Sequence, residues 1–154
     1  YRDWYARGYL LGTPGNVADY AFIRKTLNEL AAKYQLTLLG YDKWNASKLA
    51  SELYNDDGLP VAEQRQGFGL NAAAKVFQRL VQGGLLRHPG SPALDWMAGN
   101  ATVISNPEAS IKVVKPRDAN KVDGIVACIM AVGAALATPP ESTNVTSSAV
   151  MVAE

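Results

Sequence analysis

The stretch "KVDGIVACIMAVGAAL", Lys121 to Leu136, decides the fold of this chain. One acidic residue, Asp123, stands near its head, and the run that follows carries no charge. The stretch can be a membrane anchor, a plain core helix, or a buried helix that holds one carboxylate in place. It is shorter than the about 20 apolar residues that cross a bilayer, which disfavours the anchor. A helix that is apolar nearly all round is typically buried, so we expect it to pack against a sheet.

Upstream of this helix, two short apolar runs predict buried strands, at residues 36–42 and 59–66. A helix is predicted between them, beginning at Asn45 as its cap and ending at "NDDG". Because a helix separates the two strands, we expect them to be parallel neighbours in a sheet. This alternation of helix and strand predicts an α/β fold.

The remaining elements are predicted from periodicity and from turn residues. The segment 18–34 has apolar residues at steps of three and four, which indicates a helix capped by Asn16 or Asp19. We also expect a helix from Asn71 to Gly83-Gly84, a short helix that begins near Pro92, and a hairpin over 101–116 with "NPEAS" as its turn. In the helix from Asn71, the side chains expected to face inward are Phe77, Leu80 and Val81. Residues 138–154 show no period, so we expect a domain over 1–137 and a flexible tail.

The composition excludes some classes of protein but does not identify a binding partner. The 154 residues include 15 Lys and Arg against 14 Asp and Glu, so a nucleic-acid binder of this kind would need a local basic patch. The single cysteine, Cys128, excludes a disulfide framework and is expected to be a small core residue. The sequence contains no Gly-x-x-x-x-Gly-Lys-[Ser/Thr] motif, so it carries no P-loop ATPase.

Two carboxylates occupy positions at which ligands collect in α/β folds. Asp42 ends a predicted strand and Asp123 begins a predicted helix, which places both at the edge of a sheet. Two carboxylates brought together repel each other unless a divalent cation lies between them. Mg²⁺ and Mn²⁺ suit carboxylate oxygens, and two such ions about 3.5–4 Å apart can clamp the oxygens of a phosphoryl displacement. Taken singly, however, each residue is also explained as a strand end or a helix cap.

A basic cluster precedes Asp123. It consists of cations opposed only by Asp118, namely Lys112, Lys115, Arg117 and Lys121. The cluster can be a solvated hairpin end, or it can be the basic rim that an enzyme acting on a polyanion needs. The candidates to extend such a rim are Arg65, Arg79 and Arg87.

His88 is the only histidine, so it cannot build a His-rich zinc site. It is expected either to bond locally in a turn or to contact phosphate beside Arg87. A Cys-His nucleophilic pair with Cys128 has no support in the sequence.

Several stretches, taken in order, resemble the large terminase subunits of tailed double-stranded DNA phages. They are the opening segment over 1–23, "GYDKWNASKLASEL" over 40–53, "RQGFGLNAAAKVFQRLV" over 65–81, "LRHPGSPALDWMAGN" over 86–100, and "KVDGIVACIMAVGAAL". Each stretch alone is weakly specific, whereas the ordered set is specific. The resemblance covers the chain up to about Ala137.

The resemblance implies a function. Such subunits join an N-terminal ATPase motor to a C-terminal nuclease with an RNase H-like fold, a mixed sheet flanked by helices, and this chain resembles only the nuclease. That nuclease cuts concatemeric DNA during packaging with acidic residues and Mg²⁺ or Mn²⁺, which implies that Asp42 and Asp123 are catalytic metal ligands. The implied partners are double-stranded DNA, the ATPase domain, the small terminase subunit and the portal, in the cytoplasm of a bacterial host and away from any membrane.

The resemblance also implies DNA contacts, for which the candidates are Arg87, His88, Lys115, Arg117 and Lys121. Four residues occupy recurrent motif positions without an assigned role, namely Gln66, His88, Asn100 and Lys115.

One departure from the family pattern concerns the first catalytic aspartate. RNase H-like nucleases place it on the first strand, which in terminases lies upstream of a W-x-x-x-G segment, here "WYARG" from Trp4 to Gly8. Asp3 lies in loop-like sequence and is a poor substitute. We therefore expect this chain to lack one of three metal-binding carboxylates and the leading strands, and to be inactive alone. A sheet edge left open in this way would invite pairing with another chain.

Two other functions fit the same sequence. The domain can be a DNA- or protein-docking module on an RNase H-like scaffold, in which both carboxylates serve only as caps. A Holliday-junction resolvase would share the nuclease chemistry, but the resemblance of "RHPGSPALDWMAGN" to terminases argues against it. Metal binding by Asp42 and Asp123 would favour the nuclease over the docking module.

Overall fold

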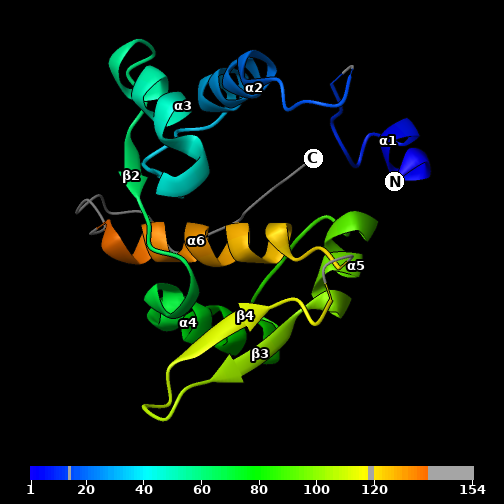
Figure 1. Ribbon diagram of the computed structural model, residues 1–154, viewed down its shortest axis with the longest axis vertical. Coiled ribbons are helices and arrows are strands. Elements are labelled where there is room, and N and C mark those ends of the chain that lie inside the picture. The colour runs from blue at the N-terminus through cyan, green and yellow to red at the C-terminus, as the bar shows by residue number, and fades with distance from the viewer. Residues whose placement is uncertain (14, 118–119, 139–154) are drawn as a thin grey trace.

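The computed structural model describes residues 1–13, 15–117 and 120–138. Figure 1 shows the order of its elements, which are α1 (Arg2–Ala6), α2 (Tyr20–Lys33), β1 (Leu39–Tyr41), α3 (Lys43–Asn55), β2 (Val61–Glu63), the 3₁₀ helix η1 (Gly67–Leu70), α4 (Asn71–Gln82), α5 (Pro92–Asn100), β3 (Thr102–Ser105), β4 (Ile111–Val114) and α6 (Asp123–Ala137). The predicted α/β class is confirmed. Apart from Thr138, the predicted tail lies outside the described residues.

The strands form two separate pairs within the described part of the chain. β1 and β2 are parallel, with Leu39 opposite Val61, which confirms the predicted parallel neighbours. β3 and β4 form the predicted antiparallel hairpin. The parallel strands are shorter than predicted because Pro60 has no N–H to extend the ladder and because the chain enters α3 directly after Tyr41.

Two predictions about the chain before β2 are wrong. Asp42, not Asn45, is the N-cap of α3, because its backbone is still extended directly after β1 and its carboxylate accepts a hydrogen bond from the Trp44 N–H. The segment around Asp3 is not a loop but the short helix α1, and Asp3 pairs at 3.7 Å with Arg7, the residue that follows this helix. In contrast, Asp19 caps α2 as predicted, accepting a hydrogen bond from the Phe22 N–H at 3.0 Å.

The helix α6 runs through the middle of the molecule (Figure 1). Its buried residues Ile125, Ile129 and Met130 pack with Ala73 and Ala74 of α4. Val81, predicted to face inward from α4, is 52% exposed, because the small alanines face α6 instead. The expected burial of α6 against a sheet is only partly right: its neighbours are α4 and α5 as well as β1. None of the described helices is both long and apolar enough to span a membrane.

The helix α2 is tied to the end of α3 by a charge cluster. Arg24 donates to Asp57 from Nε at 2.6 Å and from Nη2 at 2.7 Å, and Asn28 donates to the same carboxylate at 2.9 Å. Asp56 and Glu52 lie within ion-pair distance of the same guanidinium. The "NDDG" segment thus ends α3 as predicted and, in addition, anchors α2.

This cluster predicts a stability that depends on pH. Hydrogen bonds from Arg24, and then from Asn28, lower the pKa of Asp57 from 3.8 to about 2. Because the folded pKa is the lower one, the contribution to stability is complete above pH 3.8 and is lost as the pH falls towards 2. We expect Asp57→Asn to lower the free energy of unfolding at pH 7, and the difference from wild type to shrink at pH 2. Denaturant titration at both pH values measures this.

The control for this prediction is Glu108→Gln, which changes an exposed acid in the hairpin turn. It should change stability little at either pH. If the difference in the free energy of unfolding between wild type and Asp57→Asn were the same at pH 2 and pH 7, Asp57 would not be the source of the stability lost at low pH.

Candidate active site

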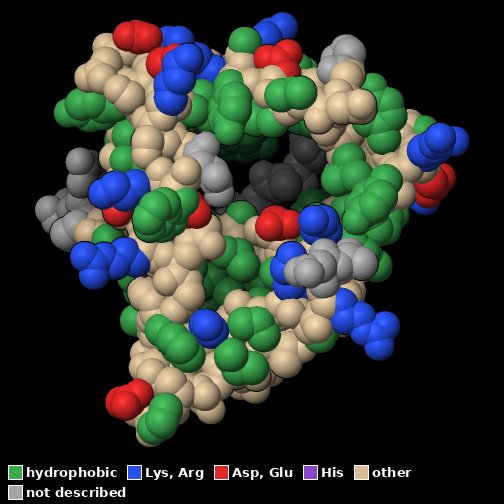
Figure 2. Space-filling model, in the orientation of Figure 1, with side chains coloured by type: hydrophobic (Ala, Val, Ile, Leu, Met, Phe, Trp, Pro, Cys, Tyr) green, Lys and Arg blue, Asp and Glu red, His purple; other side chains and the backbone are tan. Residues whose placement is uncertain are grey.

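A cleft of about 640 Å³ lies between β1 with α3 on one side and β4 on the other. The space-filling view shows the molecule hollowed in this region, with acidic and basic side chains on the rim (Figure 2). Apolar residues of five elements line much of the cleft, including Leu27, Leu39, Leu49, Val113 and Met130. The polar residues that line it are Asp42, Gln66, Lys115, Asn120, Lys121 and Asp123. Both predicted catalytic carboxylates therefore border one cavity.

Asp42 reaches the cleft from the end of β1. Its Oδ1 accepts a hydrogen bond from the backbone N–H of Trp44 at 3.4 Å, so the expected alternative role as a helix cap is real. The residue is half-buried and still lines the cavity. Capping through one oxygen does not use the full capacity of a carboxylate, which has two acceptor oxygens.

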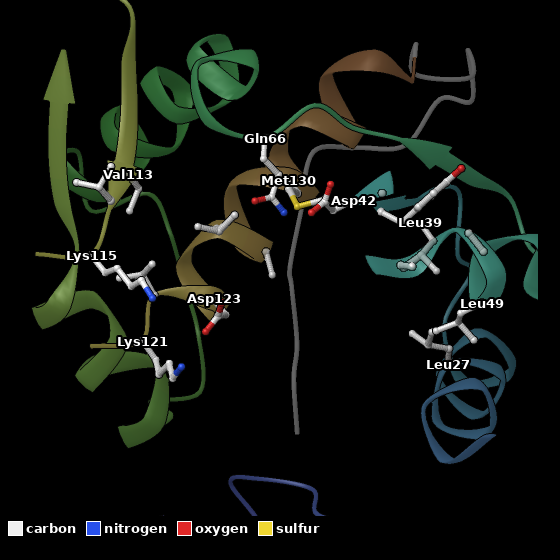
Figure 3. A pocket seen from close by; sticks show the side chains of 18 of the residues that line it. Leu27, Leu39, Asp42, Leu49, Gln66, Val113, Lys115, Lys121, Asp123 and Met130 are labelled. Atoms are coloured by element: carbon white, nitrogen blue, oxygen red, sulfur yellow. The ribbon is translucent and has the colours of Figure 1, made fainter. Parts of the chain in front are cut away.

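Asp123 reaches the cleft from the opposite side (Figure 3), as the first residue of α6. The N-cap position belongs to Val122, and no side-chain hydrogen bond caps this helix. The alternative explanation of Asp123 as an N-cap is therefore wrong. Its charge is favoured by its place in the first helical turn, and its side chain is exposed to the solvent of the cleft.

The segment that leads to Asp123 is held by α5. Asn100 donates from Nδ2 to the carbonyl oxygen of Lys121 at 3.1 Å and accepts from Asn120 Nδ2 at 2.7 Å. The Gly124 N–H donates to Met97 Sδ at 3.2 Å, and a Cβ at position 124 would lie 2.8 Å from that sulfur. Asn100, a motif position without an assigned role, thus fixes the start of α6. The partners Asn120 and Met97 were not predicted.

The candidate DNA contacts divide between two places. Lys115 and Lys121 line the cleft on the same side as Asp123 (Figure 3), and Arg117 is exposed between them along the chain. Arg87 is exposed elsewhere, in the loop between α4 and α5, and His88 borders a second cavity. Asp118, expected to oppose the cations, lies outside the described residues.

The second cavity, of about 520 Å³, is mostly apolar and is lined by His88 and Cys128 among others. His88 Nδ1 accepts a hydrogen bond from the Gly90 N–H at 3.3 Å, which supports the local turn role. Burial raises the pKa of the Cys128 thiol, which disfavours the nucleophilic thiolate. The geometry of this cavity therefore gives no support to a Cys-His pair.

Comparison with known proteins adds to this geometry. The family described as terminase large subunit, endonuclease domain, matches residues 1–139. The chain is 31% identical over 137 residues to the terminase large subunit of Enterobacteria phage HK97, which covers 88% of the chain and 27% of that protein. It is 30% identical over 149 residues to protein YmfN of Escherichia coli (strain K12), covering 93% of the chain and 32% of the relative.

A solved structure agrees with these relatives. The crystal structure of the HK97 bacteriophage large terminase superposes on this chain with a TM-score of 0.78 at 31% identity, covering 86% of the chain and 28% of that protein. The arrangement of helices and small sheets is consistent with an RNase H-like fold. The chain thus spans between about a quarter and a third of the length of its relatives.

Proposed function

The chain belongs to the terminase large subunit endonuclease domain family, and from this premise we propose that it is a divalent-metal-dependent endodeoxyribonuclease that cleaves concatemeric viral DNA during packaging. The observation that carries the proposal is the placement of Asp42 and Asp123 on opposite sides of one cleft. The expected substrate is double-stranded DNA in the bacterial cytoplasm. The expected partners in the complete protein and its assembly are an ATPase domain, the small subunit and the portal.

The chemistry of the two side chains fits Mg²⁺ or Mn²⁺, because both ions prefer carboxylate oxygens. Asp42 and Asp123 would hold the metal, and the backbone around them is fixed by the α3 cap and by the Asn100 contacts. Bound there, the metal would lower the pKa of a coordinated water and stabilise charge on the scissile phosphate. The role of Asp123 is to present a carboxylate from a helix that α4 and α5 hold in place.

Among the described residues, no group of three or more His, Cys, Asp or Glu side chains could hold a metal ion. Mg²⁺ is often held by one or two carboxylates together with water molecules, so the pair Asp42 and Asp123 is compatible with the proposal.

The cations on the rim would hold the DNA backbone. Lys115 and Lys121 border the cleft beside Asp123, and contacts to phosphate position a duplex without reading its sequence. We expect Lys121→Ala in the complete protein to weaken binding to DNA of any sequence, and to reduce the slope of log affinity against log salt by about one. Fluorescence anisotropy with Ca²⁺ in place of Mn²⁺ measures both.

The matched control is Lys25→Ala, which removes an exposed lysine that does not line the cleft and pairs with Glu29 at 3.8 Å. It should leave the salt slope unchanged. If the slope of log affinity against log salt were equal for wild type and Lys121→Ala, Lys121 would not contact the DNA backbone. The candidates Arg87, His88 and Arg117 can be tested in the same assay.

A second candidate function is a docking module that does not cut. It is favoured by the cap that Asp42 forms with α3 and by Trp44, whose side chain is 89% exposed beside that cap. Tryptophan is enriched among the residues that contribute most to binding at protein interfaces, which is why Trp44 fits a docking role. The two functions differ in metal binding, which the docking module does not need.

A further inference from the structure

Gln64 bonds to both elements that carry the candidate catalytic acids. It directly follows β2, and its backbone N–H donates to the carbonyl oxygen of Tyr41 at 2.9 Å, one residue before Asp42. Its side-chain Nε2 donates to the carbonyl oxygen of Met130 at 3.0 Å, in the middle of α6. A single residue therefore links the strand that ends one residue before Asp42 to the helix that begins at Asp123.

Two glycines make room for this amide. A Cβ atom at position 40 would lie 2.9 Å from Gln64 Cδ and closer still to Nε2, which is nearer than real Cβ contacts allow. A Cβ at position 133 would lie 3.2 Å from Gln64 Oε1. Gly40 lies on β1 and Gly133 on α6, so the amide occupies a slot between the two elements. The slot exists because both positions lack a side chain.

We infer that Gln64 is a positioning residue for the metal site: its amide sets the place of the β1 end, and thus of Asp42, relative to α6 and Asp123. This inference rests on the proposed nuclease function. Gln64 is not among the residues that line the cleft, so it acts through the two acids and not on the substrate. The Met130 carbonyl also accepts a hydrogen bond within α6, so loss of the Gln64 amide does not leave it unsatisfied, but removes a hydrogen bond that joins the end of β2 to α6.

The first arm of the test replaces the amide in the complete protein. Gln64→Met keeps the length of the side chain and removes the donor. We expect the Mn²⁺ concentration for half-maximal plasmid cleavage to rise about tenfold, the lower end of the effect of losing groups that orient metal ligands. Cleavage at saturating Mn²⁺ should be largely kept. Gln35→Met, at an exposed position before β1, is the control and should leave the Mn²⁺ dependence unchanged.

The second arm uses the steric contact. Gly40→Ala places a Cβ against Gln64 and should also raise the Mn²⁺ requirement, whereas Gly40→Ala combined with Gln64→Ala should recover part of the loss. Thermal unfolding of each variant is measured in parallel. A Gln64→Met protein with lowered stability but an unchanged Mn²⁺ requirement would overturn the inference and leave a structural role only.

The same assay separates this inference from the proposed function. Asp42→Asn reports whether the site cuts at all: loss of cleavage there, with an unchanged Mn²⁺ requirement in Gln64→Met, overturns the positioning role alone. A wild-type protein without metal-dependent cleavage overturns both.

Discussion

We expect Asp42→Ala and Asp123→Ala each to abolish the Mn²⁺-dependent nicking of supercoiled plasmid by the complete protein that contains this domain. Each change removes a carboxylate from the cleft where the proposed metal is held. A metal contributes several kcal/mol of transition-state stabilisation, so the expected loss is about a thousandfold or more in rate. Conversion of supercoiled to open-circular plasmid, followed on agarose gels over time, measures it.

The matched control is Asp95→Ala. Asp95 is an exposed acid in the first turn of α5, as Asp123 is in the first turn of α6, but it does not line the cleft. Its removal should leave nicking within about twofold of wild type, as expected for a surface change away from the site. Full cleavage by either cleft mutant would contradict the assignment of Asp42 and Asp123.

We expect Ile129→Ala to lower the free energy of unfolding of the domain by about 2–5 kcal/mol, the range for removing a large buried side chain. Ile129 is 3% exposed and belongs to the cluster that packs α6 against α4. The resulting cavity would loosen the helix that presents Asp123. Urea denaturation followed by circular dichroism gives the free energy.

Leu136→Ala is the control on the same helix, because Leu136 is 58% exposed. Its effect should stay within about 0.5 kcal/mol. If both variants lowered the free energy of unfolding by a similar amount, the packing of α6 against α4 through Ile129 would be contradicted.

Elements with local chemical signals were predictable from the sequence. The helix α4 ends where Gly83 follows it, α5 begins at Pro92, and the hairpin turns at "NPEAS", as expected. The start of α3 was misplaced, because Asp42 and Asn45 are both good cap residues and only the strand before them decides between the two. The strand lengths were overestimated, because pairing depends on the partner strand and not on the apolar run alone.

The sequence predicted the two acids of the site and their meeting at the edge of a sheet, but not the contacts that hold them. Their common cleft agrees with what the ordered motifs implied, whereas the supporting contacts came from the structure alone. Gln64 bonds to Met130 across 66 positions, Arg24 to Asp57 across 33, and Asn100 to Lys121 across 21. Such pairs leave no local period in a sequence, because the partners meet only after the elements pack. The glycines at positions 40 and 133 mark one of these contacts, but a sequence does not tell a close approach from a turn.

Calorimetric titration of the complete protein with Mn²⁺ tests the central claim, that Asp42 and Asp123 together hold a divalent metal. We predict saturable binding by wild type, its loss in both Asp42→Asn and Asp123→Asn, and no change in Asp95→Asn. Binding that persists in both cleft mutants, or no binding by wild type, would contradict the claim and favour the docking module.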